Sequence, residues 1–336
     1  MINDSTKSKV LFGFTTVALC LIVVLLFACN QPFDPRGELD QKHVVFSVLS
    51  TDRNVQFLTV KRSHTPIGYA AGADTADKAI RNAIVTISDG GLTMRLRDTT
   101  LPRSDTSKFK FPLRAYVVSP FKPLHGGSYI VRVEATGFGS ASESIVVPMR
   151  PGLGIDPISM AILDRPGGYD KDASILLSMI LGKGAYGYRA RLYVDYEVLK
   201  GSEWVEERVE IPTAFASASR SDYSFVVYPQ FTRSSSNNHA SGNHKNDVYS
   251  RTLTEVAYIK YGSTKIVFNR VVVQLLQVDR NLYGYYMTTH TYGDPHSIRL
   301  DEPVFSGVSG GVGVIGSYTL DSLVHILPEN FSYDHF

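Results

Sequence analysis

Apolar and polar residues alternate in short runs through most of the chain after His43. Successive side chains of a strand point to opposite faces of a sheet, so this period of two predicts half-buried strands. Val, Ile, Thr and Tyr, which favour strands, recur in these runs. The longest run, at 185–201, has on one side Tyr186, Tyr188, Ala190, Leu192, Val194, Tyr196 and Val198. We therefore expect a mostly β protein.

Strand pairs separated by turns occupy the first part of the folded chain, residues 43–150. The expected pairs are His43–Ser50 with Asn54–Ser63, Ala83–Gly91 with Leu92–Asp98, and the two halves of Gly126–Pro148. An Asp-Gly-Gly turn joins the second pair. Short strands at this spacing predict an immunoglobulin-like β-sandwich, in which the polar stretch at 99–110 is a loop.

A sequence rich in Pro and Gly, at 149–154, marks the predicted boundary to a second β-rich domain, residues 151–336. One short helix is expected in this domain, capped by Asp279 and ending near Gly293 and Pro295. The polar stretch at 234–247 is expected to be a loop. Strands are expected at Trp204–Ile211, Tyr223–Tyr228, 248–262 and 265–279, and near the end of the chain.

The N-terminal sequence has the layout of an export signal. An apolar stretch from Val10 to Phe27 follows two lysines and ends at Leu-Phe-Ala-Cys29, which resembles a bacterial lipobox. We expect a signal peptide at 1–28, lipidation of Cys29 by a diacylglycerol and by fatty acyl chains such as palmitate, and a polar tether at 29–42. Each buried methylene contributes roughly 0.8 kcal/mol, so two or three chains give a stable anchor. The alternative is an uncleaved transmembrane anchor at 10–28.

Cysteine and charge counts narrow the class of protein further. The two cysteines are Cys20, an apolar filler of the leader, and Cys29. The expected mature chain therefore has no internal disulfide, and its fold must depend on burial and sheet pairing. The formal net charge is only +2, without clustered Lys or Arg, which argues against a nucleic-acid partner.

Four loose features also occur in a particular order along the chain. They are Cys29 followed by the strand pair Val44-Val45-Phe46 and Val55–Val60, then Ala83–Ile87 before Asp-Gly-Gly, then Gly127–Val133 with a strand ending at Pro148, and last Glu302-Pro303-Val304 before Gly310–Gly316. With this order the chain resembles the Bacteroidetes lipoproteins classed as domain of unknown function 4249. It departs from them at Ser306 and Gly307, where the family often has an Asn.

The resemblance implies an outer-membrane lipoprotein on the periplasmic or the surface face, with no established activity and no residues known to carry function. Such proteins are often encoded beside TonB-dependent receptors, which suggests a β-barrel partner. We therefore expect no catalytic residue, no cofactor and no bound metal, with Cys29 as the one modified position.

Two glycine motifs near the end of the chain suggest enzymes but lack the required context. Gly311, Gly313 and Gly316 match the dinucleotide fingerprint G-x-G-x-x-G, which needs a following helix and a later acidic strand. Glycines in a strand more often allow close backbone packing. Gly307-Val-Ser309-Gly-Gly311 matches a nucleophile elbow, and Asp321 and His325 follow in hydrolase order. That elbow belongs to a mostly parallel sheet with helices, which this sequence does not predict.

Four sets of side chains are candidates for metal or catalytic sites. His239, His244 and Asp247 lie in the polar stretch, where a solvated loop is the favoured interpretation. His290 and His296 flank the expected helix end and its loop, where a role at the helix end or plain exposure is favoured over ligation. A Pro-Gly-Gly turn is surrounded by Asp164, Asp170 and Asp172. These three carboxylates could form a weak calcium site, or the segment could be an ordinary turn between strands. Glu206 and Glu207 are neighbours on a strand, so they face opposite sides and cannot act as an acid–base pair.

Tyrosines are concentrated in the second half of the chain. Exposed tyrosines would favour contact with a protein or a sugar, whereas half-buried strand tyrosines are common in any sandwich. The residues concerned are Tyr186, Tyr188, Tyr193, Tyr196, Tyr283, Tyr285, Tyr286 and Tyr292.

Three functions follow as hypotheses. The first is a non-catalytic binding or accessory lipoprotein that works with a TonB-dependent transporter. The second is a structural or adhesive module of the cell envelope. The third, which the motifs support least, is a surface hydrolase that uses Ser309.

Overall fold

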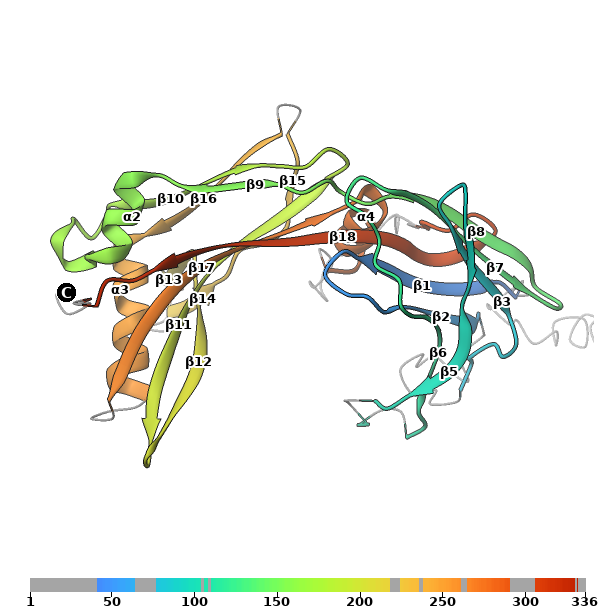
Figure 1. Ribbon diagram of the computed structural model, residues 1–336, viewed down its shortest axis with the longest axis horizontal. Coiled ribbons are helices and arrows are strands. Elements are labelled where there is room, and N and C mark those ends of the chain that lie inside the picture. The colour runs from blue at the N-terminus through green and yellow to red at the C-terminus, as the bar shows by residue number, and fades with distance from the viewer. Residues whose placement is uncertain are drawn as a thin grey trace, which may run out of the picture. The chain divides into compact units, whose positions relative to one another are not determined.

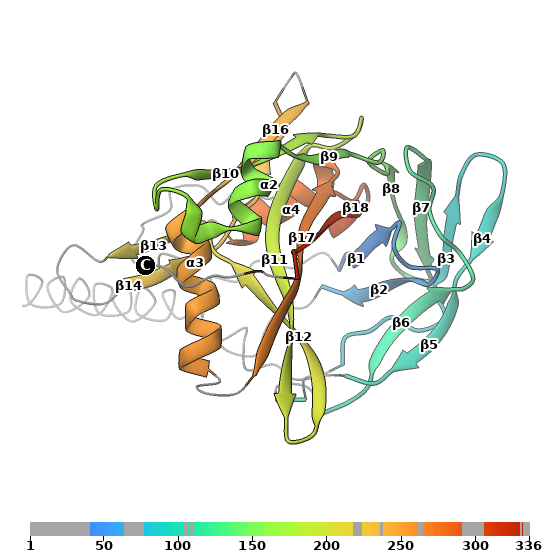
Figure 2. The same cartoon turned by 60° about the vertical axis from the view of Figure 1, so that its left-hand side comes forward.

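The computed structural model describes residues 41–63, 77–103, 106–107, 110–217, 224–235, 238–260, 265–290, 306–329 and 331. The expected signal peptide at 1–28 with Cys20, the expected lipidation site Cys29 and most of the expected tether at 29–42 lie outside these residues. Most of the described chain is β-structure, arranged in several sheets (Figures 1 and 2), which confirms the predicted fold class. None of the helices in the described part of the chain is long and apolar enough to cross a membrane.

A nine-stranded sheet contains the first and the last strand of the described chain side by side (Figure 1). Its strands in spatial order are β12 (Glu203–Ile211), β11 (Gly187–Lys200), β17 (Ile266–Val278), β18 (Gly311–Ile326), β1 (His43–Ser50), β2 (Gln56–Arg62), β6 (Leu113–Val118) and β5 (Arg97–Leu101), with β15 (Thr232–Arg233) paired to β11. Neighbours are antiparallel except β1 and β18, which are parallel.

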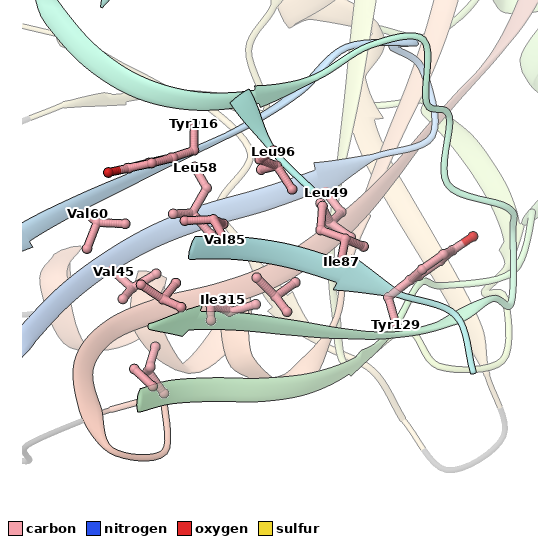
Figure 3. Packing of buried hydrophobic residues seen from close by; sticks show 14 of the residues in the cluster. Val45, Leu49, Leu58, Val60, Val85, Ile87, Leu96, Tyr116, Tyr129 and Ile315 are labelled. Carbon is pink, nitrogen blue, oxygen red and sulfur yellow. The ribbon is translucent and has the colours of Figure 1, made fainter. Parts of the chain in front are cut away.

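A four-stranded sheet packs on the β1–β2 side of the large sheet and completes a β-sandwich. Its order is β4 (Thr93–Arg95), β3 (Ile84–Ser88), β7 (Ser128–Ala135) and β8 (Gly139–Val146). Val85 and Ile87 of β3 point inward and meet Leu58 and Leu49 from the large sheet (Figure 3). Full burial of such a side chain contributes about 1.5–3 kcal/mol. The predicted sandwich and its three hairpins are therefore confirmed, with Ile315 of β18 added to the core.

The later part of the chain adds smaller sheets and helices. The further elements are β9 (Gly152–Ile155), α2 (Pro157–Asp164), the 3-10 helix η2 (Pro166–Gly168), β10 (Ser174–Ile180), β13 (Ala214–Ser217), β14 (Ser224–Val227), β16 (His239–Lys245), α3 (Asn246–Thr254), the π-helix η3 (Glu255–Lys260) and α4 (Arg280–His290). Leu163 of α2 and Tyr249 of α3 pack with Leu192, Val194 and Val271 of the large sheet. Thus α2 and α3 cover one face of β11 and β17. The domain boundary near 149–154 stays a prediction: each part has a core of its own, while β18 contributes to both.

Four expectations about local structure are wrong. The segment 248–262, expected to be a strand, forms α3 and η3, because its buried residues recur at helical spacing: Val248, Tyr249, Thr252, Leu253, Val256 and Ala257. The expected loop at 234–247 contains β16, and β5 extends into the loop expected at 99–110. The described residues contain three α-helices where one was expected.

The helix that was expected begins as predicted. Asp279 precedes α4, and its Oδ1 accepts a hydrogen bond of 2.8 Å from the backbone N–H of Leu282. Its Oδ2 accepts one of 2.9 Å from the Ser317 hydroxyl, which ties the helix start to β18. The expected end near Gly293 and Pro295 lies outside the described residues.

Burial of Asp279 makes stability depend on pH. The carboxyl is almost fully buried, and this burial raises its pKa to about 6, against hydrogen bonds that lower it. A raised pKa in the folded state stabilises the fold at low pH, and this contribution disappears as the pH rises through about 6. A difference of about two pKa units corresponds to roughly 3 kcal/mol. Urea unfolding between about pH 4 and pH 8 should show the stability difference between wild type and Asp279→Asn changing by up to that amount. A difference that stays constant with pH would contradict it.

Candidate functional site

The face of β11 opposite to α2 and α3 carries a continuous row of polar side chains. Because side chains alternate along a strand, Arg189, Arg191, Tyr193 and Asp195 share this face, while Leu192 and Val194 point into the core. Residues of β12 and β17 lie beside them in the sheet. From Arg191 onward these side chains contact one another, and we call the connected set the charged face; it comprises Arg191, Tyr193, Asp195, Glu206, Arg208, Glu210 and Arg270.

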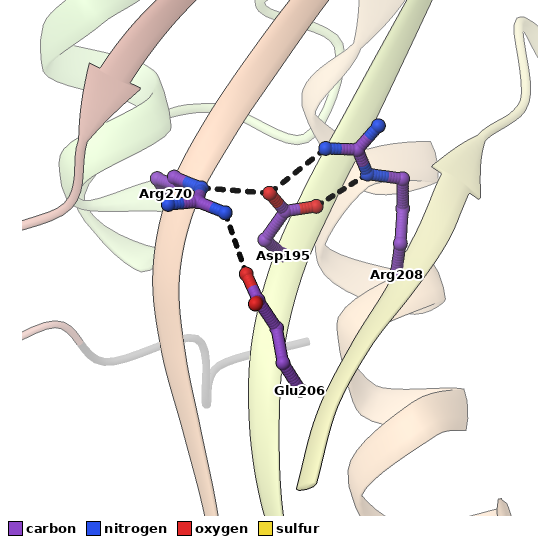
Figure 4. Close-up of polar contacts among 4 residues, drawn as sticks. All are labelled: Asp195, Glu206, Arg208 and Arg270. Carbon is purple, nitrogen blue, oxygen red and sulfur yellow. Dashed lines mark hydrogen bonds and ion pairs between the residues drawn. The ribbon is translucent and has the colours of Figure 1, made fainter.

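Asp195 is the centre of the charged face (Figure 4). Its side chain is only 2% exposed and accepts hydrogen bonds from Arg208 of β12 on one side and from Arg270 of β17 on the other. The Arg208 Nη2–Asp195 Oδ2 distance is 2.9 Å, and the Arg270 Nε–Asp195 Oδ2 distance is 2.7 Å. Arg270 also binds Glu206. Asp195 therefore fixes both guanidinium groups directly, and through Arg270 it also positions the Glu206 carboxylate.

Charge and burial act in opposite directions on Asp195. Burial by itself would raise the pKa of Asp195, but hydrogen bonds and charge from Arg208 and Arg270 outweigh it and hold that pKa below its ordinary value. The same contacts raise the pKa of Arg208, chiefly through its hydrogen bond to Asp195. Both arginines remain partly exposed, at 45% and 40% of the side chain. Fixed, half-exposed guanidinium groups present hydrogen-bond donors to a partner without losing much conformational freedom on binding.

The row continues from Asp195 toward the start of β11. Arg208 stacks over the ring of Tyr193, with 5.2 Å between Cζ and the ring centroid. The Tyr193 hydroxyl accepts a hydrogen bond of 2.9 Å from Arg191, whose Nε lies 3.3 Å from Glu210. The charged face is therefore one connected network in which each side chain orients the next.

A pocket of about 470 Å³ adjoins the Arg270 end of the charged face, just beyond the last residues of β18. Arg270 is one of its lining residues, and most of the others are apolar. The lining is formed by Ile266, Val267, Phe268, Asn269, Arg270, Ile326, Leu327, Pro328, Glu329 and Phe331. Here β11 and β17 change register, which makes Asn269 an extra residue and bends the strand, a feature common beside functional sites.

The serine of the apparent nucleophile elbow lies far from the aspartate and the histidine that would have to act with it. Ser309 precedes β18 and pairs with Ser142 of β8, whereas Asp321 binds Arg150 and His325 binds Asp164 at 2.7 Å. At about 3.3 Å per strand residue, β18 separates Ser309 from His325 by roughly 50 Å. These three side chains therefore do not form a triad.

The apparent dinucleotide motif lies within β18, where its glycines allow close packing, as expected. A Cβ on Gly313 would collide with the Val45 carbonyl oxygen, and Gly316 lies against Leu282 of α4. A phosphate-binding turn needs a loop followed by the start of a helix, whereas the residues of this motif are part of a continuous strand.

The histidines and aspartates weighed as metal ligands are also dispersed. His244 is buried on β16, with Nδ1 3.0 Å from the Pro212 carbonyl oxygen, so the expectation of a solvated loop is wrong here. Burial lowers the pKa of His244. Asp164 binds His325, while Asp170 accepts a hydrogen bond from the backbone of Asp172 in a turn. Within the described residues no three His, Cys, Asp or Glu side chains converge as a metal site requires.

His290, the last residue of α4, has no described side chain, and His296 lies outside the described residues, as does Tyr292. Among the other tyrosines named above, Tyr196 is fully buried and the rest are half-buried. Glu206 binds Arg270, whereas Glu207 binds Lys260 and the Tyr196 hydroxyl; the two carboxylates face opposite sides of β12, as predicted.

The charged face was not identified from the sequence. Arg189, Arg191, Tyr193 and Asp195 occupy the polar positions of the predicted alternation, so their shared face was readable. Their partners come from strands 13 and 75 residues away, and the register between those strands decides which charges meet.

Comparisons with known proteins give one strong match and several weak ones. A family model described as "Domain of unknown function (DUF4249)" matches residues 30–323. No curated protein matches the chain. Among solved structures, the C-terminal globular domain of an oligosaccharyltransferase from Pyrococcus abyssi shares 12% identity and a TM-score of 0.23, with 71% of this chain and 46% of that one covered.

Two further structures are similarly distant. Trypsin-activated alpha-2-macroglobulin from Escherichia coli shares 9% identity at a TM-score of 0.21, with 74% of this chain but only 15% of that chain covered. DIP-gamma IG1+IG2 shares 9% identity at 0.18, with 70% and 90% covered. TM-scores this low carry no argument about this protein.

Proposed function

Because this chain belongs to the DUF4249 family, whose description assigns no activity, we propose that it is a non-catalytic binding protein of the outer membrane. In this proposal a lipid at Cys29 anchors it, and it serves as an accessory subunit of a TonB-dependent transporter. The charged face is the surface through which it binds the transporter.

The geometry of the charged face is the observation that carries the proposal. Asp195 holds two arginines in place, and the outer edges of their guanidinium groups remain accessible beside Tyr193 and Glu206. Arginine and tyrosine are the residues that most often contribute binding energy in protein interfaces. Alternating charges on a fixed sheet favour one partner and one orientation.

Charge reversal on the charged face tests the partner. Affinity-tagged protein from detergent-solubilised membranes should recover a large outer-membrane β-barrel, and Glu206→Arg should lose most of it. Glu206 is 59% exposed, so its replacement should leave the fold intact. The matched control is Glu134→Arg on β7, which should recover the barrel as wild type does. Recovery of no barrel, or equal loss in both variants, would count against the proposal.

A second experiment tests the anchor. Wild-type protein should sediment with membranes, and mass spectrometry should find acyl chains on the processed N-terminus at Cys29. Cys29→Ser should lack these chains and retain its leader, because the lipidated thiol is the signal for cleavage. Cys20→Ser is the control and should behave as wild type. An unmodified Cys29 in the wild-type protein would refute the anchor.

A further inference from the structure

Aromatic rings and arginines gather where β11, β15 and α4 begin, next to the charged face. Tyr186 and Tyr283 meet edge to face, with centroids 5.4 Å apart, and Phe231 and Tyr286 are 4.3 Å apart. Gly187 makes this arrangement possible, because a Cβ there would collide with the ring of Tyr283. We call this set the arginine–tyrosine cluster: Tyr186, Arg189, Phe231, Arg233, Arg280, Tyr283 and Tyr286.

Three guanidinium groups of the cluster lie against these rings. Arg233 and Arg280, both exposed, place Cζ 5.0 Å and 6.0 Å from the Tyr186 centroid, and Arg189 lies 5.0 Å from that of Phe231. Contact with aromatic faces fixes an arginine while leaving its donor edge available.

Within the described residues, the cluster has more positive charges than nearby carboxylates to balance them. The nearby carboxylate of Glu210 is paired with Arg191 of the charged face. None of Arg189, Arg233 and Arg280 forms an ion pair with a carboxylate in the described chain. The Nε of Arg189 is buried and, within that same part of the chain, lacks a hydrogen-bond partner. Burial and the neighbouring Arg191 lower the pKa of Arg189. An anion bound beside Arg189 would stabilise its positive charge and so offset both effects.

We infer that the arginine–tyrosine cluster binds an acidic saccharide, a sugar that carries a carboxylate or a sulfate. The guanidinium groups supply forked donors that match the planar or tetrahedral oxygens of such an anion. The accessible parts of the half-buried Tyr283 and Tyr286 rings supply apolar surface for the C–H face of the sugar ring, and their hydroxyls can exchange hydrogen bonds with its hydroxyl groups. A net charge of only +2 argues against a long polyanion such as nucleic acid as the ligand. The inference goes beyond the proposed function, because the cluster would bind sugar with or without a transporter on the charged face.

Calorimetry with defined oligosaccharides tests the inference on the full-length protein in detergent. The probes are an oligogalacturonide, the neutral galactose oligomer of the same length, a sulfated dextran oligomer, its unsulfated parent and an oligoglutamate of matching charge. At least one acidic sugar should bind, and its neutral counterpart should bind at least about tenfold more weakly. Affinity should also fall as salt is added.

Substitutions in the cluster locate the site. Arg233→Ala and Arg280→Ala remove exposed side chains that lie outside the charged face, and each should weaken binding by about tenfold. Arg233→Lys keeps the charge but not the fork and should lie between wild type and Arg233→Ala. Arg95→Ala, an exposed arginine of β4, is the matched control and should bind as wild type does.

Several results would overturn the inference. The inference fails if neither acidic sugar binds at about 1 mM, or if the neutral counterpart binds as tightly as the acidic sugar. It also fails if oligoglutamate binds as tightly as the acidic sugar or more tightly. Finally, it fails if the combined Arg233→Ala, Arg280→Ala variant binds the acidic sugar with unchanged affinity. The pull-down of a β-barrel reports on the charged face alone, so failure of one experiment leaves the other interpretable.

Discussion

Replacing Gly313 by alanine should lower the free energy of unfolding by roughly 3 kcal/mol or more. Gly313 lies opposite Val45 in the parallel pairing of β1 and β18, with a φ of +110° that side chains rarely adopt. A Cβ would also collide with the Val45 carbonyl oxygen, which is backbone and cannot rotate away. Relief requires β1 and β18 to separate, and those strands carry Val45 and Ile315 of the sandwich core. Urea unfolding of the two proteins measures the difference.

Gly90→Ala separates the collision from the backbone strain. Gly90 has a φ of +91° in the turn between β3 and β4, but a Cβ there would meet nothing within 4 Å. Its replacement should therefore cost only the strain of holding a side chain at positive φ, about 1 kcal/mol. If Gly313→Ala is no more destabilising than Gly90→Ala, the contact between β1 and β18 is looser than described.

Asp195→Ala should lower the free energy of unfolding by roughly 2 kcal/mol at neutral pH. Removing the carboxylate leaves the Arg208 and Arg270 guanidinium groups facing each other without an anion between them. Deleting one partner of a fully buried pair typically costs about 3–5 kcal/mol, and we expect less here because water reaches both arginines. Urea unfolding at neutral pH, under the same conditions for both proteins, measures the loss.

A control variant and the pH dependence of unfolding show whether the loss comes from the Asp195 carboxylate itself. Glu206→Ala removes an exposed carboxylate from the same network and should change stability by less than about 1 kcal/mol. A lowered pKa also means that Asp195 stabilises the fold above its ordinary pKa, and this contribution is lost as the pH falls through the lowered value. Acid unfolding should therefore affect wild type more than Asp195→Ala. Equal effects of Asp195→Ala and Glu206→Ala at neutral pH would contradict the central role of Asp195.

Much of the fold was predictable because strand alternation is a local property. The hairpins β1–β2, β3–β4 and β7–β8 and the inward face of β11 were read directly from spacing. Where two periods compete, the prediction failed: β-branched and aromatic residues at 248–262 suggested a strand, but burial at helical spacing and packing of Tyr249 against Leu163 decided for α3.

The candidate site could not be predicted because it depends on pairing between distant strands. The parallel contact of β1 with β18 joins the two ends of the described chain, and no local pattern specifies it. The meeting of Asp195 with Arg270 depends on a register that shifts at Asp195 itself. The concentration of tyrosines around Tyr186 is visible in the sequence, but the arginines that lie on the aromatic rings come from three separate segments that only the fold brings together.

Site-specific photo-cross-linking in intact cells tests most directly whether the charged face binds the transporter. A photoreactive amino acid at Glu206 samples the charged face, and one at Leu124, which is 71% exposed in the first part of the chain, samples a surface elsewhere. We expect an adduct between the Glu206 position and a TonB-dependent outer-membrane β-barrel, and none from Leu124. No adduct at Glu206, or the same adduct at both positions, would contradict this assignment.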